Sequence, residues 1–535
     1  MTNADSRTEE APVLIVGGGM VGLSAATFLA QQGIPSIAVE RLKESSPLPR
    51  AAFFHMRTLE MFRSVGIEEQ VRTQSAKDFV PEGAIVALES VSGRKLADII
   101  PTLNEGVESL SPCRRLFLNQ PSLEPILRAR AREAGATVIQ GAEVVGVKQN
   151  ASGVQVTVRD VDTHEHRELH AKYLIAADGG HSKVREVLGI GYDGRGVFSN
   201  SLTIYFHADL SPWIGTNAWS IIYVNNPQLG GFFRMNRAGN AGFLAINTVG
   251  DPNVDPQAAS NVATDVSERR LIDLVRAGVG IPDLAVTIDG CTRWRATADV
   301  ARRFQDGRIF ICGDAAHLMP PNGGFGGNTG IHDAHNLAWK LALVLKGQAS
   351  PHLLDSYETE RKPVAKFTVE QAFSRYVART APWLKGSQPT DALVPDFDIE
   401  LGYLYGRTGE VHADPHTTYG VPGSRAPHVW LSRGGQRVST IDLTGHYLLL
   451  TGARGDKWAQ AARSAAEEHG GLSLDIATVG REIEDIEGHF SEAFGIADSG
   501  ATLIRPDGFV AWRSELGAGD ERARMREALG RSLGG

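Results

Sequence analysis

The feature that most constrains this chain is a glycine-rich turn between an apolar strand and a helix near the N-terminus. Residues 13–16 (VLIV) form a short apolar run, which is typical of a buried parallel strand. Gly17, Gly19 and Gly22 follow with the spacing G-x-G-x-x-G. In this motif the first glycine permits the turn, the second lets the backbone approach a pyrophosphate, and the third lets the helix pack closely on the strand. Because the helix N-terminus adds unpaired N–H groups and partial positive charge, the sequence predicts a βαβ unit that binds a dinucleotide.

A carboxylate stands where such a unit needs one. Glu40 ends the second predicted strand about 20 residues beyond the turn, where its side chain would accept a hydrogen bond from a ribose hydroxyl. We also expect Arg41, the next residue, to contact the cofactor. The motif does not distinguish FAD from NAD, but the negative charge of Glu40 disfavours a 2′-phosphate, so we do not expect the NADPH site here. A glycine-rich turn in an unrelated α/β protein is the alternative.

Composition excludes several other classes of protein. With 535 residues, 42% of them hydrophobic and 22% charged, the chain is expected to be globular, with about two or three domains. A net charge of −8 argues against nucleic-acid binding, and no apolar run approaches the ~20 residues that cross a membrane. The polar, acidic start does not resemble a signal peptide. Cys113, Cys291 and Cys312 are too widely spaced for a disulfide framework, which fits a reducing cytoplasm.

Two later segments each end an apolar strand with an acidic residue. In YLIAADGGHSKVRE, Asp178 ends the strand and Arg185 lies in the next element. In GRIFICGDAAHLMPPNGGFGGN, Gly313 and Asp314 end the strand, and a glycine-rich turn after Pro321 leads into a long helix. A carboxylate at a strand tip can hold a ribityl hydroxyl of a flavin, and bare glycine backbone lets a flat ring lie against it. The N–H groups at the helix start suit the N1–C2=O edge of a reduced, anionic flavin, so these segments favour FAD.

Taken together, the motifs GxGxxG, DGxxSxxR and GDAAHxxPPxGGxGxN resemble those of the class A flavoprotein aromatic hydroxylases, which share the para-hydroxybenzoate hydroxylase fold. Within that family the chain looks most like the phenol and chlorophenol 6-monooxygenase branch, including relatives that hydroxylate polyketides and pyridinols. The resemblance implies an FAD-dependent monooxygenase that takes electrons from NADPH or NADH and uses O2. It also implies that a flavin C4a-hydroperoxide oxidises a phenolic or hydroxy-heteroaromatic ring, in natural-product tailoring or chlorophenol-type degradation.

The resemblance also assigns the residues that would hold FAD. Asp314 would hold the ribityl chain, and Gly327 and Asn328 would contact the pyrimidine edge of the flavin. Arg50 would reach the pyrophosphate, although it could instead cap a helix or pair with a surface acid. Gln120 would touch FAD, although it could be a simple N-terminal residue of a helix. The other expected contacts are Asp178 and Arg185, which the family links to both FAD and the nicotinamide cofactor, and Gly313, Pro321, Gly324 and Gly326.

Three histidines in or near the third motif admit other interpretations. We expect His317 to be a structural rather than a catalytic histidine. His332 and His335 stand three apart on a predicted helix, which is a possible ligand spacing. No carboxylate or thiol partner is implied for them, so no metal site is expected.

Strand-like runs rich in aromatic and β-branched residues lie between the second and third motifs: SLTIYFHADL, SIIYVNNP, GGFFRMNR and GFLAINTV. They predict an antiparallel sheet, and in the family such a sheet forms the substrate pocket. By the same resemblance, Tyr223 would bond the substrate hydroxyl and help to ionise it, with a core tyrosine as the alternative. The carbonyl of Pro321 would approach the same hydroxyl, and His55 would reach the pocket from the first domain.

The third of these runs predicts two opposite faces. Phe232, Arg234 and Asn236 share one face by the two-residue period of a strand, and Phe233 and Met235 share the other. The family usually directs the first set towards the substrate and often carries a carboxylate-clamping arginine slightly further along. An insertion here leaves both Arg234 and Arg237 as candidates, so a carboxylate on the substrate stays an open question.

The last part of the chain is expected to be a separate unit. Residues 380–398, rich in proline and polar residues, are interpreted as a boundary. The predicted order after it, strand, helix, strand, hairpin and helix, suggests a thioredoxin-like domain over residues 400–535 that lacks redox cysteines and serves packing or subunit contact. The discontinuous FAD-binding domain is expected over residues 1–79, 112–184 and 302–345, and the substrate domain with its helices over 80–111, 185–301 and 346–395. A homodimer would be usual for the family.

The predicted fold class is therefore α/β, with a Rossmann-like FAD-binding domain, an inserted antiparallel-sheet substrate domain and a thioredoxin-like C-terminal domain. The predicted function is hydroxylation of a small aromatic substrate. The rival functions are Baeyer–Villiger oxidation or epoxidation on the same fold, flavin reduction without oxygenation, and flavin binding by a protein that is not an enzyme. Neither nucleic acid nor a membrane is an expected partner.

Overall fold

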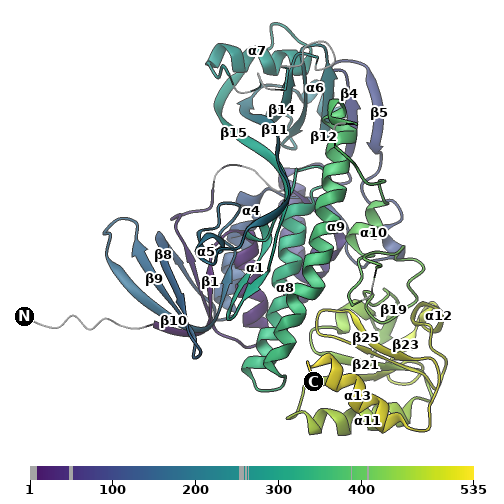
Figure 1. Cartoon of the computed structure of the whole chain (residues 1–535). Coiled ribbons are helices and arrows are strands. Elements are labelled where there is room, and N and C mark those ends of the chain that lie inside the picture. The colour runs from purple at the N-terminus through teal and green to yellow at the C-terminus, as the bar shows by residue number, and fades with distance from the viewer. Residues whose placement is uncertain are drawn as a thin grey trace, which may run out of the picture.

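The computed structural model describes residues 9–46, 48, 52–251, 258–259, 262, 264–386, 388–406 and 409–535. Arg50, an expected FAD contact, lies outside these residues. The chain builds a mixed α/β structure with two eight-stranded sheets and smaller sheets in its C-terminal part. The long helices α8 (Phe325–Leu345) and α9 (Asp355–Arg379) run side by side through its middle (Figure 1). None of the described helices combines the length and the apolar character needed to cross a bilayer.

The first sheet is parallel at its centre and carries the glycine-rich turn. β1 pairs in parallel with β2 on one side and with β10 on the other. The strand order is β16 (Gln305–Asp306), β17 (Ile309–Ile311), β10 (His166–Ala176), β1 (Glu9–Val16), β2 (Ser36–Glu40) and β7 (Thr137–Gln140), with β9 (Val154–Asp160) paired to β10 and β8 (Ala142–Gln149) paired to β9. Because β1, β10 and β17 are parallel, the three motifs that follow them meet at one edge of the sheet.

Helix α1 (Met20–Gln31) packs against β1 and β2, α4 (Gln120–Glu133) and α8. All its residues from Gly22 to Leu29 are buried, which explains why this segment has no polar stripe. A Cβ atom built on Gly22 would lie 1.9 Å from the carbonyl oxygen of Gly17. Glycine at this position therefore allows α1 to pack directly against the turn.

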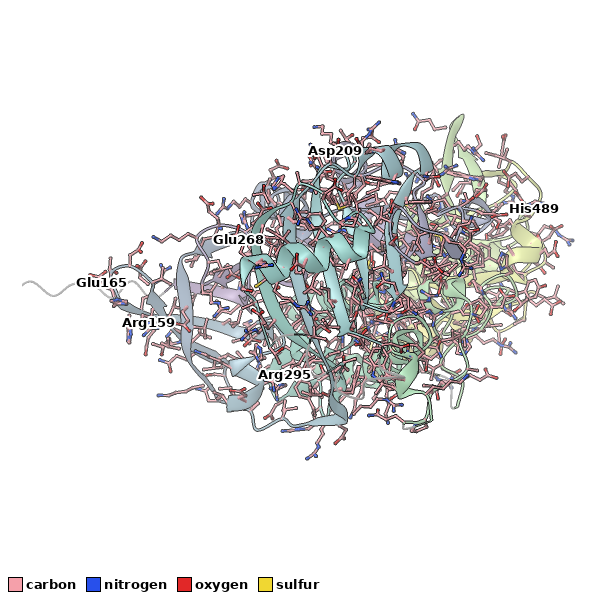
Figure 2. All side chains as sticks on the ribbon, turned by 90° about the horizontal axis from the view of Figure 1, so that it is seen from above. Arg159, Glu165, Asp209, Glu268, Arg295 and His489 are labelled. Atoms are coloured by element: carbon pink, nitrogen blue, oxygen red, sulfur yellow. The ribbon has the colours of Figure 1, made fainter. Side chains whose placement is uncertain are left out.

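The second sheet is mainly antiparallel and lies above the first in Figure 1. Its strand order is β18 (His317–Leu318), β15 (Thr287–Ala301), β11 (Tyr192–His207), β14 (Ala241–Val249), β13 (Leu229–Met235), β12 (Trp219–Asn226), β4 (Ala84–Leu88) and β5 (Lys95–Ile100). The four strands that the sequence predicted are β11 to β14, whereas β15, β4 and β5 were not predicted as strands. Helix α7 (Glu268–Val279) covers the outer face (Figure 2), with Leu271, Leu274, Val275, Gly278 and Val279 buried at helical spacing.

The C-terminal part contains a four-stranded sheet in the order β22 (Leu474–Thr478), β21 (Tyr447–Thr451), β24 (Ala501–Ile504) and β25 (Val510–Ser514). β21 and β22 are parallel, and the other neighbours are antiparallel. Helices α11 (Asp456–Glu468) and α13 (Glu521–Ser532) pack against each other, and their buried residues share one core with Tyr447 and Leu449. The predicted hairpin is confirmed, whereas the small sheet of β20 (Gln436–Ser439), β19 (Trp430–Arg433) and β23 (Glu484–Asp485) was not predicted.

Replacing Gly22 with alanine is expected to destabilise the protein, because the new methyl group would overlap a main-chain oxygen that cannot move alone. We expect the free energy of unfolding to fall by about 1–3 kcal/mol in chemical denaturation. Gly530→Ala is the matched control, since Gly530 also lies in a helix and a Cβ there meets nothing within 4 Å. That control should leave stability unchanged or raise it by up to about 1 kcal/mol. Equal stability of the two variants would contradict the close packing of α1.

Candidate functional site

The first two motifs meet at the carboxyl edge of the first sheet. Gly17, directly after β1, has φ +105° and donates its N–H to the carbonyl of Val39 at 2.9 Å. A Cβ atom on Gly17 would lie 2.2 Å from the carbonyl oxygen of Ala177, so only glycine lets the turn come this close to the end of β10. Asp178 is the next residue, and the turn therefore lies beside it.

The carboxylate of Glu40 holds the same turn. Its Oε2 accepts the N–H of Gly18 at 2.7 Å, and its Oε1 accepts the N–H of Leu42 at 2.8 Å. A carboxylate has about four lone-pair positions, so both oxygens can still accept a bond from a ribose hydroxyl. Arg41 is exposed next to it.

An open space lies beside Gly19 at the N-terminus of α1. Among the described residues, a Cβ atom on Gly19 would meet only Glu124 Oε1 at 3.6 Å and Gln120 Nε2 at 4.0 Å. Gln120 begins α4 and donates from Nε2 to Glu124 Oε1 at 2.6 Å, which leaves one amide hydrogen for another acceptor. The first turns of α1 and α4 both adjoin this space, an arrangement that suits a pyrophosphate.

Asp178 carries a buried acceptor atom that the protein does not use. Its Oδ2 accepts the N–H of Val184 at 3.2 Å, whereas its buried Oδ1 has no hydrogen-bond partner among the described residues. Burial raises the pKa of Asp178 above its ordinary value, although Ser182 and the N–H of Val184 lower it. A buried acceptor left without a partner costs about 1–3 kcal/mol, so this atom fits a ligand hydroxyl.

Arg185 makes its contacts within the protein. Its NH1 donates to the carbonyl of Ile190 at 2.7 Å, and its guanidinium lies 4.2 Å from the centre of the Tyr192 ring. The hydroxyl of Tyr192 lies 3.2 Å from the carbonyl oxygen of Asp314. Arg185, which is 9% exposed, thereby supports the contact between the second and third motifs.

The third motif is fixed from behind by Asp333 on α8. Its Oδ2 lies 3.1 Å from the N of Gly313 and 2.7 Å from His317 Nε2, and its Oδ1 accepts Arg361 Nε at 2.7 Å. Burial alone would raise the pKa of Asp333, but Arg361 and His317 hold it below its ordinary value. His317 is fully buried, and its Nδ1 has no partner in the described part of the chain. Asp314 is exposed at the tip of β17, in the turn that these bonds hold.

The glycine-rich turn before α8 exposes main chain. Gly323 and Gly324 have φ +89° and +68°, and the N–H of Gly324 donates to the carbonyl of Pro321 at 3.0 Å. That carbonyl keeps a second lone pair for a substrate hydroxyl. A Cβ atom on Gly324 would lie 2.9 Å from Phe53 Cβ, so the turn packs closely on β3 (Phe53–Phe54).

Asn328 holds this turn from inside the protein. Its Nδ2 donates to the carbonyls of Phe53 at 2.8 Å and Gly324 at 2.7 Å. Its Oδ1 accepts from the N–H of His55 at 3.0 Å and from Thr58 Oγ1 at 2.6 Å. All four hydrogen-bonding positions of the side chain are filled. The predicted contact of Asn328 with a flavin would therefore come from its main chain.

His55 lies against the inner side of the turn, just before α2 (Met56–Ser64). Its Nε2 lies 2.9 Å from the carbonyl oxygen of Gly323, and its ring meets Phe53 and Phe325 edge-on at 4.9 Å and 5.4 Å. Burial lowers the pKa of His55, although Glu400 raises it. The ring is therefore neutral at neutral pH, and the proton on Nε2 can be donated to Gly323.

The second sheet presents an aromatic face and a core face. Tyr223 on β12 is in register with Phe232 on β13, and Arg234 lies on the same face two residues further along. Phe233 and Met235 are buried in the core that includes α7. The two faces that the strand period predicted are thus confirmed.

Tyr223 connects the aromatic face to the glycine-rich turn. Its hydroxyl accepts a bond from Asn322 Nδ2 at 3.3 Å, and Asn322 also donates to Thr380 Oγ1 at 2.8 Å. Burial raises the pKa of Tyr223, whereas Arg379 and Asn322 lower it. Neither Asn322 nor Arg379 was predicted from the sequence. The available signal for the latter was its spacing of four from Arg375 at the end of a helix, beside the stretch interpreted as a boundary.

Arg234 is a buried cation that has aromatic neighbours but no ion pair among the described residues. It is 5% exposed, and its guanidinium lies 5.2 Å and 4.9 Å from the centres of the Phe79 and Phe243 rings. No hydrogen bond or ion pair joins it to any residue that the structure describes. Burial lowers its pKa to about 9, against the opposing effects of Tyr205 and Asp78, so it stays charged at neutral pH. Because a buried unpaired charge is unfavourable, this position suits an anionic or strongly polar group of a ligand.

Arg237, the other candidate, is exposed and caps α3 (Glu68–Asp78). Its guanidinium donates to the carbonyl of Ala76, and its N–H donates to the carbonyl of Asp78 at 2.8 Å. Arg234 is therefore the arginine on the aromatic face.

His332 and His335 point to different surroundings. His332 Nε2 lies 3.1 Å from Thr58 Oγ1, whereas His335 meets the Phe28 ring edge-on. Within the described ranges, no three His, Cys, Asp or Glu side chains form a group that could hold a metal ion.

Comparisons with known proteins point to one family over nearly the whole chain. Residues 10–372 match the family described as the FAD binding domain, and residues 419–535 match the aromatic-ring hydroxylase C-terminal family. The chain is 47% identical to 4-methyl-5-nitrocatechol 5-monooxygenase from a Burkholderia species, over 97% of each protein. It is 32% identical to 2,4-dichlorophenol 6-monooxygenase of Delftia acidovorans, over 99% of each. The solved structure of aklavinone-11 hydroxylase with FAD and aklavinone has a TM-score of 0.90 to this fold at 34% identity, covering 98% of this chain and 99% of that one.

Asn328→Asp tests whether the turn is held from behind. The change removes both donors of the side chain and buries a charge, so we expect the free energy of unfolding to fall by about 2–4 kcal/mol. Asn150→Asp is the matched control, because Asn150 is exposed and uses only its Oδ1, as an acceptor for Ser152 and Gly153. Chemical denaturation of both variants checks this. A loss no larger than in the control would contradict the role of Asn328.

Proposed function

The chain belongs to the FAD-dependent aromatic-ring hydroxylases, monooxygenases that use NAD(P)H and O2, and we propose that its substrate is a small phenolic or hydroxy-heteroaromatic ring bound between the turn 320–327 and the aromatic face of the second sheet. One observation carries the proposal. The hydroxyl of Tyr223 is joined to the turn through Asn322, and Arg234, which has no ion pair in the described part of the chain, lies on the same face of the sheet as Tyr223. Bound FAD supplies electron transfer from NAD(P)H and activation of O2.

The described residues offer each part of FAD a suitable position. The open space beside Gly19 suits the pyrophosphate, Glu40 suits a ribose hydroxyl, and the partnerless oxygen of Asp178 suits a second hydroxyl. Asp314 is proposed to hold the ribityl chain, and the bare main chain after Pro321 would face the flat ring. The proposed contacts are Gly17, Gly19, Gly22, Glu40, Arg41, Gln120, Asp178, Arg185, Gly313, Asp314, Pro321, Gly324, Gly326, Gly327 and Asn328, with Arg50 from outside the described residues.

Tyr223 is proposed to orient and ionise the substrate hydroxyl. Loss of the phenolic proton makes the ring richer in electrons, which an electrophilic oxygen donor requires. Because burial raises the pKa of Tyr223, its own hydroxyl stays protonated and can donate to the substrate oxygen. The carbonyl of Pro321 is proposed to accept a bond from the substrate hydroxyl before it ionises. His55 is proposed to hold the glycine-rich turn in place.

Arg234 is proposed to bind a substituent of the ring. A nitro or carboxylate group has two oxygens in one plane, which match the edge of a guanidinium. The flanking rings of Phe79 and Phe243 lie close to this guanidinium. The name of the nitrocatechol monooxygenase relative, whose substrate bears such a group, supports this choice.

We also propose a domain division, a cellular location and an oligomeric state for the protein. The order β22-β21-β24-β25, with α11 and α13, supports a thioredoxin-like domain over residues 400–535. The two large sheets support an FAD-binding domain over residues 1–79, 112–184 and 302–345, and a substrate domain with its helices over 80–111, 185–301 and 346–395. Three unpaired cysteines support a cytoplasmic location, and the family resemblance supports a homodimer.

Oxygen labelling tests the proposed reaction. Phenols and hydroxypyridines that stimulate NAD(P)H oxidation by the FAD-loaded protein should give products with one added hydroxyl, whose oxygen comes from 18O2. NAD(P)H oxidation without label in any product would indicate a reductase. An expanded ring or an epoxide would contradict aromatic hydroxylation.

Tyr223→Phe should slow hydroxylation about 100-fold, because loss of one positioned hydrogen-bond donor costs roughly 3 kcal/mol in comparable sites. Binding of FAD, followed by flavin fluorescence, should be unchanged, because Tyr223 lies on the second sheet. Unchanged turnover would remove Tyr223 from the reaction.

Arg234→Met should raise the KM for a nitro- or carboxyphenol about tenfold or more, since a hydrogen bond to a charged group contributes about 1.5–3 kcal/mol. The KM for a phenol without such a group should change little. Arg237→Met, which removes the exposed arginine three residues away, is the control and should behave as the unaltered protein. Equal effects on both substrates would argue against the proposed subsite.

A further inference from the structure

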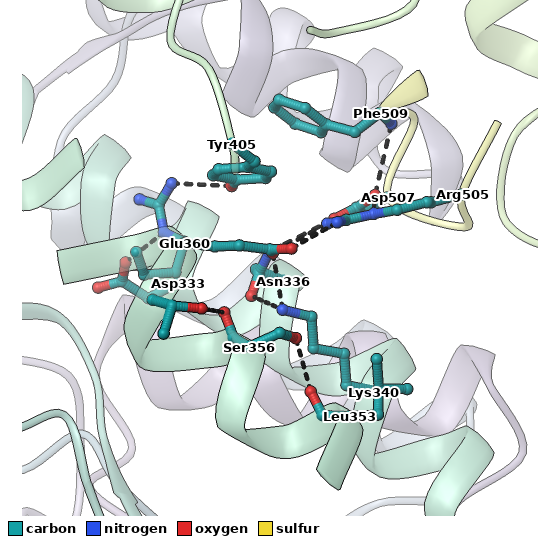
Figure 3. Close-up of polar contacts among 12 residues, drawn as sticks. Asp333, Asn336, Lys340, Leu353, Ser356, Glu360, Tyr405, Arg505, Asp507 and Phe509 are labelled. Atoms are coloured by element: carbon teal, nitrogen blue, oxygen red, sulfur yellow. Dashed lines mark hydrogen bonds and ion pairs between the residues drawn. The ribbon is translucent and has the colours of Figure 1, made fainter. Parts of the chain in front are cut away.

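Two consecutive residues of α9 belong to two different buried networks. Glu360 faces the C-terminal part of the chain, where its carboxylate accepts bonds from both terminal nitrogens of Arg505, at 2.5 Å and 3.0 Å (Figure 3). It also accepts from Lys340 Nζ at 2.7 Å and from Asn336 Nδ2 at 2.8 Å, both on α8. Arg361, the next residue, is directed at Asp333, which supports the third motif.

The C-terminal partner is the tip of the hairpin between β24 and β25. Arg505 also pairs with Asp507, and the carbonyl of Asp507 accepts a bond from Arg57 on α2. Arg505 and Lys340 bring two positive charges, and Glu360 and Asp507 bring two negative ones. Burial alone would raise the pKa of Glu360, but Arg505 and Lys340 hold it below its ordinary value. The four charges therefore balance, and loss of Arg505 alone would leave one cation for two carboxylates.

Arg361 carries the second network to the third motif. Its Nε donates to Asp333, whose other oxygen is bonded to the N–H of Gly313, one residue before Asp314. Its NH1 donates to the hydroxyl of Tyr405 at 3.0 Å. The ring of Tyr405 stacks on Phe509 of the hairpin at 4.1 Å, so the same hairpin supports Glu360 by charge and Arg361 through Tyr405.

A second contact of the C-terminal part reaches α2. Arg425 forms two bonds to the carboxylate of Glu60, which also pairs with Arg57 at 2.9 Å. Burial would raise the pKa of Glu60, but Arg425 and Arg57 lower it to about 2. Helix α2 begins directly after His55, which contacts the glycine-rich turn.

We propose that residues 419–535 act as a brace for the FAD site and that Arg505 is a positioning residue for the turn that carries Asp314. The inference goes beyond the proposed reaction, because it concerns the affinity for FAD and not the fate of the substrate. Residues 396–535 contain no cysteine, so thiol chemistry is not available to this part of the chain. Without Arg505, the cluster would keep one buried cation, Lys340, for the two carboxylates of Glu360 and Asp507. Helix α9 would then have to shift or admit water. Arg361 would move with α9, and the bond from Gly313 to Asp333 would loosen.

FAD titration of the apoprotein tests the brace. Arg505→Met should raise the Kd for FAD about tenfold or more, and Arg505→Lys should recover part of the loss. The midpoint potential of bound FAD should also shift in Arg505→Met. Arg481→Met is the matched control, because Arg481 lies in the same part of the chain and forms a two-bond pair with Asp456 at the surface. Its Kd should stay within about twofold of the unaltered protein.

A merely structural role predicts a different result. A lower melting temperature with an unchanged Kd and potential, measured where Arg505→Met is fully folded, would overturn the proposal. If Arg505→Met does not fold, Tyr405→Phe decides, because it removes only the hydroxyl that accepts from Arg361 and keeps the stack on Phe509. An unchanged Kd for FAD in Tyr405→Phe would overturn the proposal, whereas a rise supports it.

Discussion

The candidate site depends on the hydrogen bonds that hold the glycine-rich turn before α8 in place. Gly323 and Gly324 turn the chain in left-handed conformations, and a Cβ atom on either would lie within 3 Å of the side chain of Phe325 or Phe53, so glycine allows the turn to pack this closely. Glycine does not fix this conformation by itself, because glycine loses more conformational freedom on folding than any other residue. Asn328, with all four of its hydrogen bonds directed at the turn and its neighbours, supplies the rigidity from behind.

Side chains from neighbouring elements hold the other parts of the candidate site as well. Gly313, the residue before Asp314, is bonded to Asp333, which in turn is bonded to Arg361 of α9. On the second sheet, the strand period gives one face to a packed core and leaves Tyr223 and Arg234 on the other. Within the described residues, Asp178 Oδ1 has no hydrogen-bond partner, and the Arg234 guanidinium has neither a hydrogen bond nor an ion pair. Both positions suit polar atoms of a ligand.

Local patterns in the sequence predicted most of the elements that build this site. The glycine spacing predicted β1, the turn and α1, and the alternation in GGFFRMNR predicted which face Arg234 would take. Sequence could not choose between Arg234 and Arg237, because that choice depends on Phe79 and on the end of α3, which lie far away in the chain. For the same reason it did not show that the side chain of Asn328 bonds to Phe53, His55 and Thr58, so the predicted flavin contact is left to its main chain.

Residues 380–398 carry contacts that their composition does not predict. Their proline and polar residues suggested a boundary, and α9 ends directly before them at Arg379. Val394 and Asp396 are bonded to Arg375, and Thr380 is bonded to Asn322 beside the turn. The C-terminal part was expected to serve packing or subunit contact. That expectation did not include its ion pairs with α2 and α9. Such long-range pairs cannot be predicted from sequence periodicity, since each charged residue taken alone resembles an ordinary surface residue.

A crystal structure of the chain with FAD would show where the flavin lies. We expect the isoalloxazine ring across the main chain of residues 323–327, with an oxygen of its pyrimidine edge about 3 Å from a main-chain N–H at the start of α8. The Tyr223 hydroxyl and the Arg234 guanidinium should face the space on the other side of the ring. A flavin bound elsewhere, or a side chain lying between the ring and this stretch of backbone, would contradict this arrangement.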